Sequence, residues 1–311
     1  MCCYRKLTST VNITHEQWLA FRRIGIGGSD ASTILGLNPY NSLFRLYADK
    51  KGLIKAVEDN EAMRQGRDLE QYVAERFTEA TGKKVKRRNF MFQSIDNPFM
   101  LADIDREIIG ENAALECKTT SAFAKSDFEI GEIPLTYYVQ MMHYMAVMGY
   151  DRMYLAVLVL GKAFYWFTVE RNEEEISNLI LAEKYFWNTY IVADIPPELD
   201  GSEATEDTLN EMYPTEKDVE NTVYISENLM NEYQQTKKIY DRASANLNAI
   251  KNKIQMTLGK CAYGNSSNYN VSWKSQERNT IDSKKLKNIY PKIYKECLKS
   301  SKSRVLKITE I

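Results

Sequence analysis

Residues 101–118, LADIDREIIGENAALECK, decide the fold of this chain. An apolar approach leads to Asp105, a turn follows at residues 110–112, and a second apolar run leads to Glu116, Cys117 and Lys118. Read as two strands joined by a turn, this pattern brings Asp105, Glu116 and Lys118 to one end of a sheet. Glu116 and Lys118 are two residues apart, so on a strand their side chains point to the same face.

These three side chains suit a metal-dependent phosphodiesterase. Two carboxylates can hold a hard divalent cation, and an ammonium group beside them can position a water molecule. The alternative is a solvated strand end, because Asp and Glu are common beside turns and a Glu-x-Lys pair often faces water. The charges follow directly on an apolar run, so they are either solvent-facing or functional.

Composition limits the class of protein. With 311 residues, 44% of them hydrophobic and 27% charged, the chain has the profile of one large or two small globular domains. No apolar run approaches the roughly 20 residues of a membrane helix, and the first residues lack the apolar core of a secretion signal. The five cysteines form no C-x-x-C pair, which argues against a disulfide framework, a zinc knuckle or an iron–sulfur cluster. We therefore expect a cytoplasmic protein with no membrane partner.

The distribution of charge says more than the net charge of −1. Residues 83–88, KKVKRR, are densely basic, residues 194–220 hold ten Asp or Glu and one Lys, and the chain from residue 274 is basic again. Such asymmetry is compatible with a basic channel backed by an acidic exterior. The alternative for KKVKRR is a solvated strand edge, which lysines often protect from pairing.

Hydrophobic periodicity predicts the elements of the first 195 residues. Expected helices cover residues 14–23, 31–35, 61–81, 134–148 and 172–190. Expected strands cover residues 85–92, 99–109, 113–119, 152–160 and 163–170. This order predicts an α/β fold with a mixed central sheet flanked by helices and one crossover connection.

The rest of the chain is expected to be a separate part. We predict a core at residues 1–195, an acidic linker at 196–216 and a mainly helical extension with short strands at 217–311. Within the extension we predict a long polar helix at 217–258, short strands at 269–273 and 305–308, and a helix at 283–300 that Pro291 interrupts. The apolar side of the long helix comprises Leu229, Tyr233, Tyr240, Ala243, Leu247, Ile250 and Ile254.

Three further features could serve the same chemistry. Glu70 lies beside the apolar stripe of its helix and could reach a metal at the sheet edge, or be a plain surface residue. Gln140 and Tyr144 lie four apart on one helix face and could bind a phosphate oxygen or a metal-bound water, or simply pack. The loop GIGGSD at residues 25–30, entered from Arg22, could cradle a phosphate or merely connect two helices.

Together these features resemble the YqaJ-type viral recombinases, phage alkaline exonucleases related to lambda exonuclease within the PD-(D/E)XK nuclease superfamily. The matching segments are RRIGIGGSDASTILGLNPY, GRDLEQYVAERF, MLADIDREI with ALECKT, and QMMHYMAVMGYDRMYLAVLV, over about residues 15–170. The resemblance implies a restriction-endonuclease-like core fold. The loop GIGGSD is neither a P-loop nor a dinucleotide fingerprint, because no Gly-Lys-Ser/Thr follows it and no strand precedes it.

The resemblance also implies roles for single residues. Asp105, Glu116 and Glu70 would be acidic metal ligands, with the backbone carbonyl of Cys117 completing the site, and Lys118 would polarise or position the attacking water. The Pro-Asp step of the family is Ile104-Asp105 here, and Asp103 is a second aspartate expected on the same face. We favour Asp105 over Asp103, because ten residues separate Asp105 from Glu116.

The remaining implied roles concern substrate binding. Gln140 would lie beside the active centre together with Tyr144. Arg22 and Ser29 would bind the terminal 5′-phosphate or a phosphate of the DNA backbone.

The activity implied by the resemblance is an Mg²⁺-dependent 5′→3′ exonuclease acting on double-stranded DNA ends, with Mn²⁺ able to substitute. It would leave 3′ single strands for an annealing protein of the RecT or Bet type, in a bacterial host carrying a phage or prophage. Because lambda exonuclease forms a ring trimer, we also expect a homo-oligomer. Two alternatives stay open: an endonuclease of the same fold, restriction-like or junction-resolving, and a non-catalytic DNA-binding or assembly protein.

Overall fold

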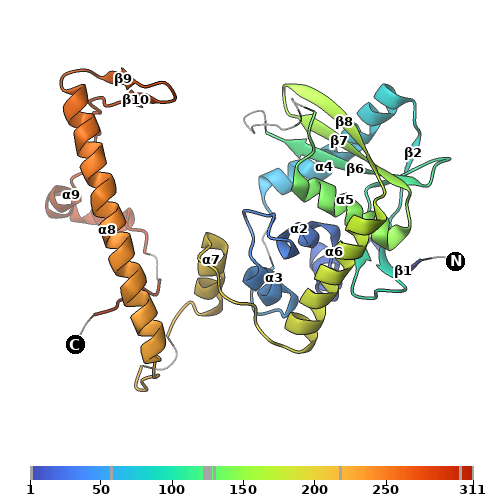
Figure 1. Cartoon of the computed structure of the whole chain (residues 1–311), viewed down its shortest axis with the longest axis horizontal. Coiled ribbons are helices and arrows are strands. Elements are labelled where there is room, and N and C mark those ends of the chain that lie inside the picture. Colours follow the sequence, from blue (N-terminus) through green and yellow to red (C-terminus); the bar gives the residue numbers. More distant parts are fainter. Residues whose placement is uncertain are drawn as a thin grey trace. The chain divides into compact units, whose positions relative to one another are not determined.

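The computed structural model describes residues 3–56, 59–121, 128, 131–216, 219–300 and 303–309 (Figure 1). The chain divides into two compact units, Met1–Pro214 and Thr215–Ile311. In the described part of the chain, no helix combines the length and the apolar character needed to cross a bilayer.

A five-stranded sheet forms the centre of the first unit, with the strand order β2-β5-β6-β7-β8. Its strands are β2 (Val85–Arg87), β5 (Arg106–Ile108), β6 (Ala113–Thr120), β7 (Arg152–Val159) and β8 (Ala163–Glu170). β6 and β7 run parallel and all other neighbours are antiparallel, so the sheet is mixed. Helix α5 (Leu135–Met148) joins β6 to β7, which confirms the predicted crossover.

Two helices cover opposite faces of this sheet, as Figure 1 shows. Helix α4 (Glu61–Thr81) packs Val73 and Phe77 against Ala113 and Leu115 of β6. The alternate residue Ala114 faces the other side and joins the core around α5. Because successive strand residues point to opposite faces, Glu116 and Lys118 share the α5 side of the sheet with Ala114.

A smaller sheet lies beyond α5 and has the order β1-β3-β4. It comprises β1 (Tyr4–Ser9), β3 (Phe90–Ser94) and β4 (Leu101–Ala102). Helix α5 contacts β3 and β4 as well as the central sheet, so nearly all of its surface is buried. The surrounding helices are α1 (His15–Arg23), α2 (Gly28–Ile34), α3 (Leu43–Lys50) and α6 (Glu173–Phe186), which continues into the π-helix η2 (Trp187–Val192).

The predicted strands at 85–92 and 99–109 are each divided between the two sheets. β2 and β5 belong to the central sheet, whereas β3 pairs with β4 on one side and with β1 on the other. Both runs are broken by short irregular segments, at residues 88–89 and 103–105. Neither break contains a glycine or a proline, so the strongest local signals for the end of a strand are missing and the sequence does not reveal the change of sheet.

The predicted acidic linker at 196–216 contains a packed helix, α7 (Glu203–Met212). The Thr205 hydroxyl donates a hydrogen bond to Ser42 Oγ at 2.8 Å, and Arg45 lies 3.8 Å from Glu211. The first unit therefore extends to Pro214 rather than ending at residue 195. Acidic residues cover the outer side of α7, and its buried side carries threonines. Because this buried side has no apolar stripe, hydrophobic periodicity did not predict that the helix packs.

The second unit is mainly helical, as predicted. It comprises α8 (Glu227–Leu258), the hairpin β9 (Tyr263–Asn265) and β10 (Asn270–Ser272), α9 (Ser283–Ile289) and α10 (Pro291–Glu296). Pro291 divides the last helical segment in two, in agreement with its missing N–H group. Residues 305–308 are irregular rather than a strand, and residue 217, the predicted start of the long helix, lies outside the described residues.

A fully buried ion pair ties α5 to its neighbours. His143 Nδ1 lies 2.7 Å from Glu183 Oε1 of α6, and Nε2 lies 2.8 Å from the backbone carbonyl of Leu101. Burial acts to lower the pKa of His143, but the Glu183 carboxylate and the Leu101 carbonyl raise it above its ordinary value. The protonated imidazole can donate from both nitrogens, which satisfies both acceptors.

We expect His143→Ala to lower the free energy of unfolding by about 3–5 kcal/mol, because it leaves Glu183 buried without its partner. Urea denaturation at about pH 6 measures the effect. The double replacement of His143 and Glu183 by methionine leaves no buried charge and should cost much less. Equal losses in the single and the double variant would contradict this interpretation.

Candidate active site

Strand β6 brings Glu116 and Lys118 into contact. Lys118 Nζ lies 2.6 Å from Glu116 Oε1, and Glu116 is only 4% exposed. Burial acts to lower the pKa of Lys118, but the charges of Glu116 and Asp105 raise it above its ordinary value. Lys118 is therefore an ammonium ion at neutral pH, able to donate hydrogen bonds but not to accept a proton.

Asp105, the residue directly before β5, completes this cluster. Arg106 pairs with Leu115, so the antiparallel register places Asp105 opposite Glu116. Asp105 Oδ2 accepts a hydrogen bond from the backbone N–H of Cys117 at 2.7 Å. Burial, reinforced by the charges of Glu116 and Glu70, raises the pKa of Asp105 well above its ordinary value. Burial also raises the pKa of the Cys117 thiol, which argues against a thiolate nucleophile there.

Gln140 orients the cluster from α5. Its Nε2 donates to Glu116 Oε1 at 2.7 Å and lies 3.2 Å from the Tyr144 hydroxyl, while its Oε1 accepts from Lys118 Nζ at 3.1 Å. Burial, together with the charge of Glu116, raises the pKa of Tyr144 well above its ordinary value, so the phenol keeps its proton. The predicted partnership of Gln140 and Tyr144 at one helix face thus brings both residues to the carboxylates.

The carboxylate pair has unused capacity for a cation. Glu116 Oε2 is buried and has no hydrogen-bond partner among the residues that the structure describes, and burial together with the charges of Glu116 and Glu70 raises the pKa of Asp105. Hard divalent cations such as Mg²⁺ bind such oxygen atoms. Within the described residues, no three Asp, Glu, His or Cys side chains are grouped so that they could hold a metal ion alone. A cation at this site would therefore need further oxygen atoms from the backbone, water or a bound phosphate.

Glu70 is close to the cluster but engaged elsewhere. Its carboxylate forms an ion pair with the buried Arg106 and lies 3.2 Å from Arg87 Nη2. Arg106 also donates to the Asp105 carbonyl at 2.7 Å. Arg106 was not predicted as a site residue from the sequence. The signal was its place on the same strand face as the core residue Ile108, because a buried arginine there requires a carboxylate partner. The role of Glu70 as a third metal ligand stays a prediction.

Asp103 and Asp105 point to different partners. The chain between β4 and β5 is irregular, so these residues do not share a strand face as expected. Trp18 Nε1 of α1 donates to Asp103 Oδ2 at 2.8 Å, and burial raises the pKa of Asp103 above its ordinary value. Asp105 is the aspartate that contacts the strand of Glu116.

Arg22 and Ser29 meet beside the cluster. Arg22 Nη2 donates to Ser29 Oγ at 2.8 Å and to Asp30 Oδ1 at 3.2 Å. Lys50 Nζ of α3 lies 2.7 Å from Asp30 Oδ2. Neither Lys50 nor helix α3 was predicted from the sequence. Burial acts to raise the pKa of Asp30, but Lys50 and Arg22 hold it below its ordinary value. Asp30 is therefore a carboxylate that fixes Arg22 and Lys50 in place.

Two hollows in the surface reach the cluster. The larger has a volume of about 740 Å³ and is lined in part by Lys118, Gln140 and Ser29, together with Tyr40 and Tyr137. The smaller, of about 380 Å³, is lined by Asp103, Asp105, Glu70 and the arginines Arg67, Arg87, Arg88 and Arg106. The basic run KKVKRR thus contributes two arginines to a hollow at the carboxylates.

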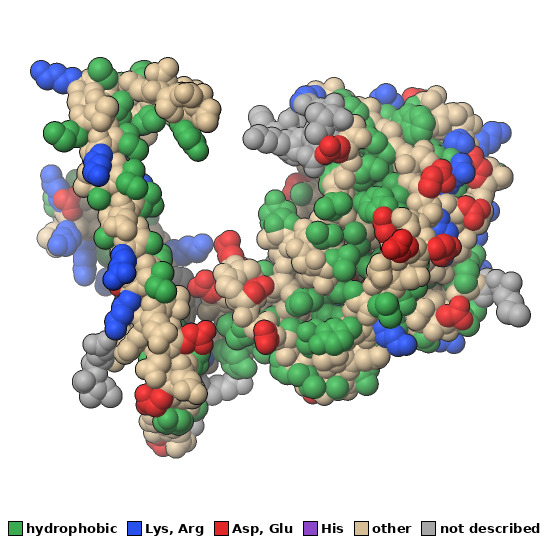
Figure 2. Space-filling view, viewed as in Figure 1, with side chains coloured by type: hydrophobic (Ala, Val, Ile, Leu, Met, Phe, Trp, Pro, Cys, Tyr) green, Lys and Arg blue, Asp and Glu red, His purple; other side chains and the backbone are tan. Residues whose placement is uncertain are grey.

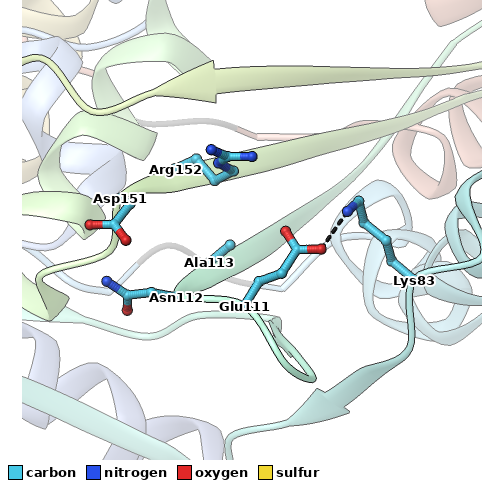
Figure 3. Close-up of a pocket in the computed structure, with 6 residues that line it drawn as sticks. All are labelled: Lys83, Glu111, Asn112, Ala113, Asp151 and Arg152. Atoms are coloured by element: carbon cyan, nitrogen blue, oxygen red, sulfur yellow. Dashed lines mark hydrogen bonds and ion pairs between the residues drawn. The ribbon is translucent and has the colours of Figure 1, made fainter.

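A third hollow, of about 300 Å³, lies at the opposite end of the strands, where β6 and β7 begin (Figure 3). Its charged groups include the ion pair between Lys83 and Glu111, and Tyr154 donates a hydrogen bond to Glu111 at 2.9 Å. None of the predicted site residues lines it. The candidate chemistry is therefore confined to the other end of β6.

Gly28 of the GIGGSD loop permits close packing of α2 on α5. A Cβ atom at this position would lie 2.6 Å from Tyr144 Cε1 and 3.0 Å from Gln140 Cγ. We expect Gly28→Ala to lower the free energy of unfolding by about 1–3 kcal/mol and to reduce activity, because the buried ring must shift. Gly66→Ala on α4, where the nearest atom is 3.7 Å away, should be neutral or stabilising by up to about 1 kcal/mol. Equal melting temperatures for Gly28→Ala and the parent would refute the expected clash.

Comparisons with known proteins relate the chain to one family. Residues 17–151 match the family model of the YqaJ-like viral recombinase domain. The chain is 38% identical over 311 residues to the protein YqaJ of Bacillus subtilis (strain 168). The alignment covers 98% of this chain and 97% of that protein. This similarity extends across both compact units.

Two solved structures align with the chain. An alkaline exonuclease (LHK-Exo) from Laribacter hongkongensis aligns with a TM-score of 0.46 and 19% identity, over 56% of this chain and 91% of that chain. A phage related exonuclease from Haemophilus somnus 129PT aligns with a TM-score of 0.44 and 13% identity, over 57% of this chain and 100% of that chain.

Proposed function

Because the chain belongs to the YqaJ-like viral recombinase family, we propose that it is a metal-dependent exonuclease that degrades double-stranded DNA from its ends. The observation that carries this proposal is the buried Glu116 carboxylate. One of its oxygens is held by Lys118 and Gln140, and the other has no hydrogen-bond partner within the described part of the chain. An arrangement that leaves a buried carboxylate oxygen without a partner is costly unless a cation uses it.

Asp105 and Glu116 are the residues that would hold Mg²⁺, or Mn²⁺ in its place. The Cys117 carbonyl and, after release from Arg106, Glu70 are the proposed further protein ligands. A bound divalent cation would supply charge stabilisation for the phosphate oxygens and would activate a water molecule. Asp105 and Glu116 would also be relieved of their mutual repulsion, which adds to burial in raising the pKa of Asp105.

Lys118 would position the attacking water and stabilise the developing negative charge. Its ammonium group is fixed by Glu116 Oε1 and Gln140 Oε1, so it needs little reorganisation when the substrate binds. Gln140 holds Glu116 and Lys118 at once and therefore maintains their relative positions. Tyr144 supports Gln140 through the hydrogen bond between them.

The polarity proposed for the reaction is 5′→3′, with Arg22 and Ser29 binding the terminal 5′-phosphate. Support comes from their mutual contact and from Ser29 lining the same hollow as Lys118. Arg22 has a guanidinium fork that can bind phosphate oxygens in a bidentate manner. The 3′ single strand left behind would pass to an annealing protein of the RecT or Bet type, and a homo-oligomer would perform the reaction.

A single digestion tests this function. The substrate is a linear duplex with one 5′-phosphorylated and one 5′-hydroxyl end, incubated beside a covalently closed circle, with Mg²⁺ and with EDTA. We expect mononucleotides from the phosphorylated end in Mg²⁺ only, with the circle intact. A nicked or linearised circle would instead assign the site to an endonuclease of the same fold. Absence of cleavage with any divalent metal would point to a non-catalytic DNA-binding protein.

A further inference from the structure

Helix α8 of the second unit carries an apolar face that the described residues of the unit leave largely exposed. The helix has 32 residues, and Leu258 at its end is its one buried residue. Figure 2 shows apolar side chains exposed along its length, and Tyr240, Leu247 and Ile250 are each more than half exposed. A polar helix gains most of its stability from packing an apolar face, so a face this long requires a partner.

The spacing along this face identifies the kind of partner. Seven-residue steps separate one row of large residues, which comprises Tyr233, Tyr240, Leu247 and Ile254. A second row with the same step lies between them and comprises Leu229, Thr236, Ala243 and Ile250. Two interleaved rows with a seven-residue period form the seam of a coiled coil, here from Leu229 to Ile254, over nearly four heptads and about 39 Å. The matching surface is another helix with the same period.

We propose that α8 pairs in antiparallel orientation with α8 of a second copy of this chain. In that orientation a member of one row faces a member of the other, so Tyr240 packs against the partner subunit's Ala243 at the centre. Leu229 then faces the partner subunit's Ile254. A parallel pair would instead place each tyrosine against its own copy and Ala243 against Ala243, which combines overpacking with a void. Alternation of large and small residues across the seam fills space best.

The charges beside the seam favour the same orientation. The antiparallel register places Glu232 next to the partner subunit's Lys253, and the two-fold axis repeats this pair. In a parallel register, Glu232 would have to pair with the partner subunit's Lys237. Lys237 Nζ, however, already lies 3.0 Å from Asp241 Oδ2 on its own helix. Such pairs at the edge of a seam contribute little energy but select orientation and partner.

The oligomeric state of the full chain tests the surface. We expect light scattering to show a concentration-dependent dimer or a multiple of it, whose dissociation constant rises at least about 100-fold in Leu247→Glu. The matched control is Met256→Glu, which places the same charge on the outer face of α8, where Met256 is 87% exposed; it should associate like the parent. A parent that stays monomeric would overturn the proposal, and this outcome includes docking of α8 on the first unit of its own chain. A Leu247→Glu protein that associates like the parent would also overturn it.

The orientation has its own test, which also holds if Leu247→Glu unfolds α8. Glu232→Lys should weaken the dimer, and adding Lys253→Glu should restore it, whereas adding Lys237→Glu should not. Disulfide mapping by mass spectrometry of a mixture of Thr236→Cys and Leu247→Cys proteins should find the link between positions 236 and 247. Links from 236 to 236 and from 247 to 247 in the separate proteins would show a parallel pair and overturn the antiparallel assignment.

Discussion

Asp105→Asn is expected to abolish most DNA hydrolysis while making the metal-free protein more stable. The rate should fall by roughly three orders of magnitude or more, because a bound cation contributes several kcal/mol and each tenfold corresponds to about 1.4 kcal/mol. The fold should tolerate the change, since an asparagine oxygen can still accept the hydrogen bond from Cys117 N–H. Loss of function with gain of stability separates a catalytic defect from misfolding.

The sign of the stability change follows from the pKa of Asp105, which burial and the charges of Glu116 and Glu70 raise in the folded protein. Between the ordinary and the raised value the folded state binds the proton more tightly than the unfolded state does. The contribution of Asp105 to stability therefore falls as the pH rises through this window, and the ionised carboxylate is unfavourable above it. Asparagine removes that cost.

Melting temperatures in EDTA measure this effect. Asp105→Asn should melt a few degrees above the parent at about pH 8, and the difference should shrink at about pH 4. Mg²⁺ should raise the melting temperature of the parent but not of the variant. Asp151→Asn, the same chemical change at the opposite end of the sheet, is the control and should alter neither property. A variant that keeps full activity would remove Asp105 from the site.

Lys118→Gln is expected to reduce the rate by about 10²- to 10⁴-fold, the usual range for a side chain that positions or transfers protons in the transition state. Because Lys118 lies 2.6 Å from Glu116, its removal also leaves the two carboxylates with less compensation. The variant should therefore melt below the parent in EDTA, opposite to Asp105→Asn. Single-turnover digestion and thermal melting measure the two effects.

Two further substitutions sharpen the test of Lys118. Lys118→Arg should not restore the rate, because the larger planar guanidinium does not fit the position held by Glu116 and Gln140. Lys86→Gln is the control. Lys86 is a half-exposed lysine of the edge strand β2 that pairs with Glu107 of β5, so this variant should behave like the parent. Full activity in Lys118→Gln would show that water positioning does not depend on this residue.

Local pattern was sufficient to predict the elements that carry the site. β6, α5 and the hairpin of β7 with β8 each show one uninterrupted period, and the left-handed Gly161 marks the turn between the hairpin strands. The contact between Glu116 and Lys118 follows from strand geometry alone. The approach of Gln140 follows once the crossover helix is known to lie on that face.

Non-local pairing decided what sequence could not predict. The division of residues 85–92 and 99–109 depends on β1, a strand from the start of the chain that pairs with β3. The engagement of Glu70 depends on Arg106, which meets it only because α4 lies on that face of β5. The packing of α7 on α3 rests on hydroxyl groups and ion pairs, which leave no apolar signature.

The most direct test of the proposed nuclease site is the rate at which Glu116→Gln digests a 5′-phosphorylated linear duplex in Mg²⁺, with duplex affinity measured on the same protein in Ca²⁺ or EDTA. Glutamine keeps the shape of the side chain and a partner for Gln140, so the change isolates the charge of the carboxylate. We predict a rate at least about 10³-fold below the parent with unchanged or tighter DNA binding, because repulsion of the phosphates is reduced. Mg²⁺-dependent digestion at the parental rate would contradict the assignment of Glu116 and Asp105 as the catalytic centre.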